Sequence, residues 1–294
     1  MIRRILAVVA LALVFVGCVT RPADAIRVGS YNIRLSPGDV GTPNAWNERK
    51  ADLVELVRKM DLDAFGMQEV CPDQAQYLRE QLPEFAFVGD HREADRKSGE
   101  ASPVFYRRSR FEAAKSGTFW LSETPDTPGL KGWGAACPRV CSYLVLRDKS
   151  TGKTFCFANT HTDHISALAR EKGMLLIVER MKEFGAGSPI VFTGDHNCCY
   201  DEAPAAAVRK ALKDSRDIAE TKDPGPHNTF QGFGRYKDGP VDVKGRKYDD
   251  YCIDYIYVSD GTRVLDFVTH DDKRPGTDLY PSDHFPVTAT IVLP

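Results

Sequence analysis

The feature that most constrains the fold is a series of short apolar segments, several of which end abruptly in a polar side chain. Segment 26–34 alternates apolar and polar residues as a strand does, and apolar residues then repeat at helical spacing within 44–60. Helices alternate with strands near both ends of the chain, whereas strands follow one another directly in its middle. This order predicts an α/β protein in which two packed sheets carry helices on their outer faces.

The same patterns predict the remaining elements of the chain. Helices are expected at 72–82, 167–184 and 203–212, with Pro72 at a first helical position and Gly185 just past the end of the second of these helices. Further strands are expected at 64–70, 104–106, 118–121, 142–146, 154–160, 189–193, 251–258, 264–268 and 287–292. The 294 residues, of which 42% are hydrophobic, show no repeat or long polar linker, so one domain spanning 26–294 is predicted.

Residues 1–25 have the composition of a signal peptide, since a basic start precedes an apolar run too short to span a bilayer comfortably. Two processing sites compete. A lipobox-like sequence ends at Cys18, and an A-x-A site lies at 23–25. The lone cysteine after the apolar run favours lipidation of Cys18, with ordinary secretion as the alternative. We therefore expect an exported protein of the periplasm or cell envelope, either held at the membrane by its N-terminal lipid or secreted.

The charge balance bears on the partners of the protein. The formal net charge is −2, and the segment 1–25 contributes more basic than acidic residues, so the mature chain is more negative still. Proteins dedicated to long nucleic acids usually carry a basic surface, which argues against that class of partner. The balance does not argue against a small phosphorylated substrate.

Seven cysteines follow Cys18. In an oxidising compartment some of them would pair, and Cys137 with Cys141 is the closest convincing pair. The odd count leaves at least one thiol unpaired. A zinc site is disfavoured because the sequence has no CxxC pair.

Eight polar side chains stand at or next to the ends of predicted strands. Each has an ordinary explanation when taken alone, such as a turn cap, a solvated strand end or an exposed sheet face. Taken together and in this order they predict a site, because layered α/β folds build their sites at strand ends. These residues are Asn32, Glu69, His161, Asp195, Asn197, Asp254, Asp283 and His284.

The short motifs that hold these residues resemble those of the endonuclease/exonuclease/phosphatase superfamily. The matching sequences are YNI at 31–33, QEV at 68–70, NTHTDH at 159–164, GDHN at 194–197, IDYI at 253–256 and SDH at 282–284. They extend over the whole of the predicted mature chain. The resemblance implies a four-layer α/β sandwich, with two packed, mainly antiparallel sheets flanked by helices. It also implies metal-dependent hydrolysis of phosphate esters, without identifying the substrate.

The resemblance also assigns a metal site. It makes Glu69 the principal ligand, with Asn32 and Asp283 close by. Mg²⁺ is the expected cofactor, with Mn²⁺ as the alternative, because hard cations prefer oxygen ligands and keep open positions for phosphate oxygens.

Catalytic roles follow from the same resemblance. Asp195 would orient or deprotonate the attacking water, and Asn197 would help to fix that water and a phosphate oxygen. His161 and His284 would donate hydrogen bonds to charge developing on the phosphate oxygens. Asp254 would accept a proton from the ring of His284 and hold its tautomer.

Two further residues are candidate substrate contacts. Arg139 could contact phosphate, with a salt-bridge role as the alternative. His196 stands where many relatives carry a large apolar residue; it could touch the substrate or be a tolerated variant.

The predicted function is that of an exported, monomeric, Mg²⁺-dependent phosphoesterase. Its substrate would be a phosphorylated small molecule, a nucleotide or a lipid headgroup. The alternatives are a secreted nuclease acting on DNA or RNA and a surface protein that keeps the fold and binds without catalysis.

Overall fold

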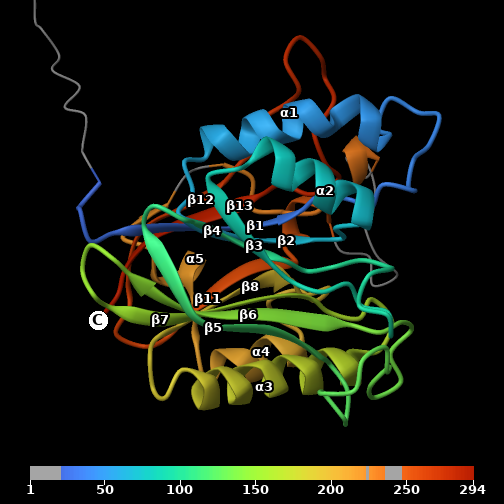
Figure 1. Cartoon of the computed structure of the whole chain (residues 1–294). Coiled ribbons are helices and arrows are strands. Elements are labelled where there is room, and N and C mark those ends of the chain that lie inside the picture. The colour runs from blue at the N-terminus through green and yellow to red at the C-terminus, as the bar shows by residue number, and fades with distance from the viewer. Residues whose placement is uncertain (1–20, 223–224, 236–246) are drawn as a thin grey trace, which may run out of the picture.

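The computed structural model describes residues 21–222, 225–235 and 247–294, and over these residues the chain forms two β-sheets flanked by helices (Figure 1). Cys18 and most of the predicted leader lie outside the described residues.

The first sheet has seven strands in the order β10-β12-β13-β1-β2-β4-β3. Its strands are β1 (Ile26–Asn32), β2 (Ala64–Gln68), β3 (Phe85–Val88), β4 (Val104–Arg107), β10 (Thr221–Lys222), β12 (Arg263–Thr269) and β13 (Val287–Val292). The second sheet has six strands in the order β5-β6-β7-β8-β11-β9. Its strands are β5 (Phe111–Trp120), β6 (Val140–Asp148), β7 (Thr154–His161), β8 (Ile190–Asp195), β9 (Lys213–Asp214) and β11 (Asp254–Val258).

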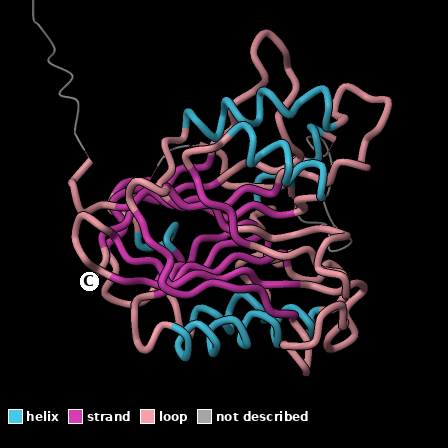
Figure 2. Tube along the Cα trace, in the orientation of Figure 1, coloured by secondary structure: helices cyan, strands magenta, loops and turns pink. Residues whose placement is uncertain are grey.

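Helices cover the outer face of each sheet, which gives four layers. In Figure 2 the strands occupy the middle of the molecule and the longer helices lie above and below them. Helices α1 and α2 pack on the first sheet, and α3 and α4 pack on the second (Figure 1). The helices are α1 (Trp46–Lys59), α2 (Pro72–Gln81), α3 (Ala167–Phe184), α4 (Ala203–Arg209) and α5 (Ser215–Ile218), with short 3-10 turns η1 (Gly232–Gly234) and η2 (Tyr248–Asp250).

Three apolar clusters hold the layers together. One lies between α1, α2 and the first sheet and includes Leu53 and Phe65. A second fills the space between the two sheets and includes Phe155. The third lies between the second sheet and α3 and includes Met174 and Phe192. Burial of these side chains is the main favourable term for folding, so the four-layer architecture rests on all three clusters.

Most strand pairs are antiparallel, as predicted, but two parallel pairs near the sheet centres determine where the site forms. Strand β1 pairs in parallel with β2, so that Asn32 lies beside Gln68. Strand β7 pairs in parallel with β8, so that His161 lies beside Asp195. Parallel strands present their carboxyl ends at the same edge of a sheet, and residues far apart in the sequence therefore meet there.

The predicted cysteine pair is not formed. Cys137 is a partly exposed free thiol, and Cys141 is a free thiol buried in the second sheet. Antiparallel pairing places Cys141 beside Phe119 and Thr160, where its side chain joins the core below α3. Among the described residues, no helix combines the length and apolar character needed to cross a bilayer.

Candidate active site

Asn32 connects the two sheets at the centre of the site. Its side-chain amide donates hydrogen bonds to Glu69 Oε1 at 3.1 Å and to Asp195 Oδ2 at 2.8 Å. Glu69 follows β2 directly and has a φ of 62°, a left-handed conformation that non-glycine residues rarely adopt. Such strained residues concentrate at functional sites, and here the turn directs the carboxylate of Glu69 toward the amide of Asn32.

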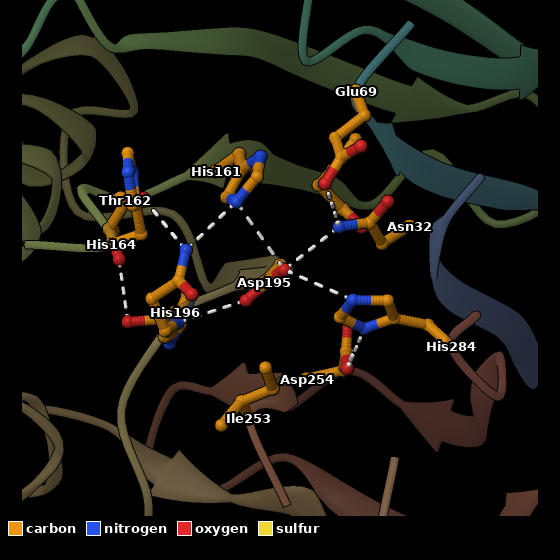
Figure 3. Close-up of polar contacts among 12 residues, drawn as sticks. Asn32, Glu69, His161, Thr162, His164, Asp195, His196, Ile253, Asp254 and His284 are labelled. Carbon is orange, nitrogen blue, oxygen red and sulfur yellow. Dashed lines mark hydrogen bonds and ion pairs between the residues drawn. The ribbon is translucent and has the colours of Figure 1, made fainter. Parts of the chain in front are cut away.

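Asp195 lies between two histidines (Figure 3). His161 Nε2 is 3.4 Å from Asp195 Oδ2, and His284 Nε2 is 3.6 Å from the same oxygen. The other ring nitrogen of His284, Nδ1, donates to Asp254 Oδ2 at 2.8 Å. Strand pairing sets up this arrangement, because β11 runs antiparallel to β8 and places Asp254 beside Asp195. All four side chains are buried.

Burial and neighbouring charges shift the proton affinities of this group. Burial and the nearby carboxylate of Asp254 raise the pKa of Asp195 to about 7. Burial alone would lower the pKa of His284, but the carboxylates of Asp254 and Asp195 raise it to about 10. His284 is therefore an imidazolium at neutral pH, and its proton on Nδ1 is held by Asp254.

His161 is in a different protonation state, and a residue missed in the sequence lies near its second ring nitrogen. Burial and the charge of Arg139 lower the pKa of His161 well below its usual value. Asn197 donates to its Nε2 at 2.9 Å, which leaves the proton of the neutral ring on Nδ1. That Nδ1 lies 3.8 Å from Glu100 Oε2, without a hydrogen-bond partner. Glu100 thus faces the Nδ1 side of His161, without the hydrogen bond that Asp254 makes to His284.

The donor atoms beside Glu69 fit a hard divalent cation. Glu69 and Asp283 both line the cleft, and both offer carboxylate oxygens, the ligand type that Mg²⁺ prefers. Arg34 supplies a positive charge to Asp283, with its Nε 3.7 Å from Asp283 Oδ2. Asn32 turns its amide nitrogen toward the carboxylates of Glu69 and Asp195, while its oxygen accepts from the backbone N–H of Arg34. Its place beside the metal stays a prediction.

A second set of atoms close enough to hold a metal consists of Asp195, Asp254 and His284. His284 Nδ1 donates to Asp254 Oδ2 at 2.8 Å, and the imidazolium of His284 would repel a cation placed among the three side chains. We therefore assign this set to the proton network and not to metal binding.

These residues open onto a cleft of about 480 Å³. Of the predicted site residues, seven line it: Glu69, Arg139, His161, Asp195, Asn197, Asp283 and His284. Asn32 and Asp254 lie behind this lining, fully buried. The sequence reasoning missed the aromatic part of the wall, which consists of Phe230, Phe233 and Tyr251.

Arg139 lies in the wall of the cleft with 6% of its surface exposed. Its Nη1 is 3.8 Å from Glu100 Oε2, and its Nη2 is 3.1 Å from His164 Nδ1. The two readings of Arg139, phosphate contact and salt bridge, are therefore compatible, because the ion pair holds the guanidinium at the edge of the cleft.

The prediction that His196 contacts the substrate is wrong for this arrangement. Its side chain is completely buried and does not line the cleft. The ring stacks on Tyr255 and Tyr257, with centroid distances of 5.4 and 5.6 Å, and packs against Phe192. Successive side chains of an extended segment point to opposite faces, so a neighbour of Asp195 faces the core.

Arg49, on α1, was also missed and ties several site segments together. Its guanidinium is fully buried and donates to four backbone carbonyls: those of Asn44 at 2.9 Å, Ile33 at 2.6 Å, Arg34 at 2.8 Å and Pro281 at 2.9 Å. The end of β1 and the segment that carries Asp283 and His284 are thus fixed by one side chain.

Comparison with known proteins finds similar sequences and similar folds. The model of the endonuclease/exonuclease/phosphatase family matches residues 29–284. A Bacteroides vulgatus protein described as an endonuclease/exonuclease/phosphatase has 33% identical residues and a TM-score of 0.83, over 92% of this chain and 99% of its own. A mannosyl-6-phosphatase of Bacteroides thetaiotaomicron has 35% identity and a TM-score of 0.81, over 91% of this chain and all of its own.

More distant relatives share the fold. The catalytic domain of human Nocturnin, with a bound sulfate, has 20% identity and a TM-score of 0.69, over 94% of this chain and 97% of its own. In sequence, Drosophila melanogaster Nocturnin is 26% identical over 89% of this chain. The chain spans only 46% of that protein, less than half its length.

Proposed function

The chain belongs to the endonuclease/exonuclease/phosphatase family, and from this premise we propose that it is a Mg²⁺-dependent phosphoesterase that hydrolyses its substrate by attack of water. One observation carries the proposal. Asp195 lies between His161 and His284 at the wall of a cleft that is also lined by Glu69 and Asp283. A binding protein would gain nothing from burying these like charges together, whereas phosphoester hydrolysis uses each of them.

The protein residues divide the work as follows. Asp195 accepts a proton from the water that attacks phosphorus, and Asn197 keeps that water and a phosphate oxygen in position. His284, as an imidazolium held by Asp254, donates a hydrogen bond to an oxygen on which negative charge develops. Glu69 and Asp283 would hold the cation, which when bound supplies charge neutralisation on the phosphate oxygens.

The test measures hydrolysis of p-nitrophenyl phosphate and bis-p-nitrophenyl phosphate with Mg²⁺, with Mn²⁺ and with EDTA. Asp195→Asn and His284→Ala are each expected to lower kcat by about 100- to 1,000-fold, because each removes a preorganised group. Asp260→Asn, at an exposed position away from the cleft, is the matched control and should keep wild-type rates. Near wild-type turnover by both site variants, or full activity in EDTA, would disprove the assignment.

For the substrate we propose a phosphomonoester of a small sugar. The relative that is a mannosyl-6-phosphatase aligns over 91% of this chain at 35% identity. A cleft of about 480 Å³ has the size of a small-molecule site, and its aromatic residues offer faces on which a sugar ring can stack. The net charge of −2 also disfavours long nucleic acids. Release of inorganic phosphate from hexose 6-phosphates should exceed breakdown of single-stranded DNA or RNA; faster nucleic-acid breakdown would favour the nuclease.

We further propose that the protein is exported and lipidated at Cys18. The basic start, the apolar run and the cysteine at its end support this location. Cells expressing the full chain should incorporate labelled palmitate into the protein, and Cys18→Ala should abolish the label. Unlabelled wild-type protein in the culture medium would indicate ordinary secretion instead.

A further inference from the structure

A second group of metal-ligating side chains lies at the rim of the cleft. The Cys137 thiol, the Asp163 carboxylate and the His164 imidazole each place one ligand atom within 4.8 Å of the other two. Cys137 is partly exposed, Asp163 is buried, and His164 is exposed and lines the cleft. None of the three residues takes part in the catalysis proposed above.

The backbone around this group is already organised. Asp163 Oδ2 accepts from the N–H of Ala136, the residue just before Cys137, at 2.8 Å. Asp163 Oδ1 accepts from the N–H groups of Ile165 and Ser166 at 3.0 and 2.7 Å. The carboxylate therefore fastens the loop that carries Cys137 to the segment that carries His164. Asp163 could still bind a metal, because a carboxylate oxygen has a second lone pair beside the one that accepts a backbone hydrogen bond.

The donor atoms differ in kind from those beside Glu69. A sulfur, a nitrogen and an oxygen form a softer set than carboxylates alone, and such a set selects transition metals over Mg²⁺. Three protein ligands with a fourth position open are the usual composition of a zinc site that is not purely structural. The group is formed by tertiary structure, so the lack of a CxxC pair in the sequence does not count against it.

From this geometry we propose that Cys137, Asp163 and His164 form a second cation site, which takes a borderline transition metal such as Zn²⁺ at the rim of the cleft. Metal–ligand distances of about 2.0 to 2.3 Å bring tetrahedral ligand atoms roughly 3.5 Å apart, so the group must close by about 1 Å. Binding also requires the thiol of Cys137 to lose its proton, and proton release makes the affinity rise with pH.

A metal ion bound at this site would change the charge at one end of the cleft. Arg139 Nη2 already contacts His164 Nδ1 at 3.1 Å, and both residues line the cleft. A dication on the cluster adds positive charge beside Arg139 and offers an open coordination position to a phosphate oxygen. We therefore expect Zn²⁺ to alter substrate affinity at this end of the cleft.

The experiment measures the alkylation rate of Cys137 by iodoacetamide in the reduced, purified protein, with peptide mapping by mass spectrometry. Zn²⁺ alone, at a few equivalents, should slow alkylation of Cys137 at least tenfold, and Mg²⁺ at the same concentration should not. Co²⁺ should give the near-ultraviolet absorption of a thiolate-to-cobalt charge transfer, which the oxygen donors beside Glu69 cannot produce.

One ligand variant and one matched control test the part that His164 plays. His164→Gln should lose most of the protection by Zn²⁺, whereas His91→Gln, which alters a partly buried imidazole outside the group, should retain it. Equal alkylation rates with and without Zn²⁺ in the wild-type protein would overturn the proposal. Full protection in His164→Gln would also overturn it, because zinc would then bind Cys137 without the proposed imidazole ligand. Neither readout depends on hydrolytic activity, so failure here is distinguishable from failure of the proposed function.

Discussion

Replacement of the buried imidazole of His196 should make the protein markedly less sensitive to acid. The ring is completely buried, and both of its nitrogens are without a hydrogen-bond partner. Burial lowers the pKa of His196 from 6.5 to about 3. In the unfolded chain the same imidazole is protonated below its ordinary pKa, so between about pH 6.5 and pH 3 the unfolded state binds more protons than the folded state.

The sign and size of the effect follow from this difference. Stability falls as the pH decreases through 6.5, because protons stabilise only the unfolded state. Each pH unit within the window costs about 1.4 kcal/mol, so His196 alone removes about 2 kcal/mol of stability between pH 7.5 and pH 5. His196→Phe keeps a planar ring against Tyr255 and Tyr257 and has nothing to protonate.

Urea unfolding at pH 7.5 and at pH 5.0 measures this quantity. The loss of unfolding free energy between the two pH values should be about 2 kcal/mol smaller in H196F than in the wild type. Any packing cost of the larger ring cancels, because each variant is compared with itself. Tyr257→Phe is the matched control in the same stack and should keep the wild-type pH dependence. An identical pH dependence in H196F and the wild type would refute the reasoning.

Three other substitutions test contacts around the site. R49M removes the donors of four carbonyls, of which those of Ile33 and Pro281 are in buried hydrogen bonds, and should cost about 3–5 kcal/mol in urea unfolding together with a lower kcat; unchanged stability would contradict this. E100Q should lower kcat roughly 10- to 100-fold with little change in stability, since Glu100 faces His161 Nδ1; a stability loss at an unchanged kcat would contradict that role. Burial raises the pKa of Asp214 to about 6, so stability should fall by about 2 kcal/mol as the pH rises from 4 to 6, and D214N should flatten this decline; an equal slope in both proteins would rule it out.

The longer elements could be predicted because their patterns are strong and their ends carry chemical signals. The helix expected at 167–184 has those bounds in the structure, with Ser166 capping its first turn and Gly185 following its end. The two-residue strands β9 and β10 were missed, because two residues are too few to show any periodicity. Strand β5 begins at Phe111, well before the 118–121 expected. Its first part was missed because most of the side chains there are exposed, so the apolar pattern of a strand is absent.

The site residues at strand ends could be predicted as a set, since register alone brings His161, Asp195 and Asp254 together. Residues that reach the site from a loop or a helix face could not. Glu100 belongs to the connection between β3 and β4, and Arg49 lies on the buried face of α1. Their contacts depend on how the layers pack, which no local pattern records.

The sequence motifs contain residues that face the cleft and residues that hold the two sheets together, and the sequence alone does not separate them. Asn159 donates to the carbonyls of Met67 at 2.7 Å and Pro103 at 2.9 Å, and its oxygen accepts from Gln68 Nε2 and Thr193 Oγ1. A Cβ on Gly66 would lie 2.1 Å from that oxygen.

This polar clamp, formed by the hydrogen bonds of Asn159, joins the two sheets directly behind the cleft. Hydrogen bonds are directional, so they fix the relative position of the sheets more closely than an apolar contact would. Asn32 then bridges Glu69 on one sheet and Asp195 on the other across a fixed gap. Gln68 next to Glu69, and Asn159 two residues before His161, therefore hold the frame. Their neighbours face the cleft, and the accuracy that phosphoester hydrolysis requires comes from the clamp as much as from the groups it positions.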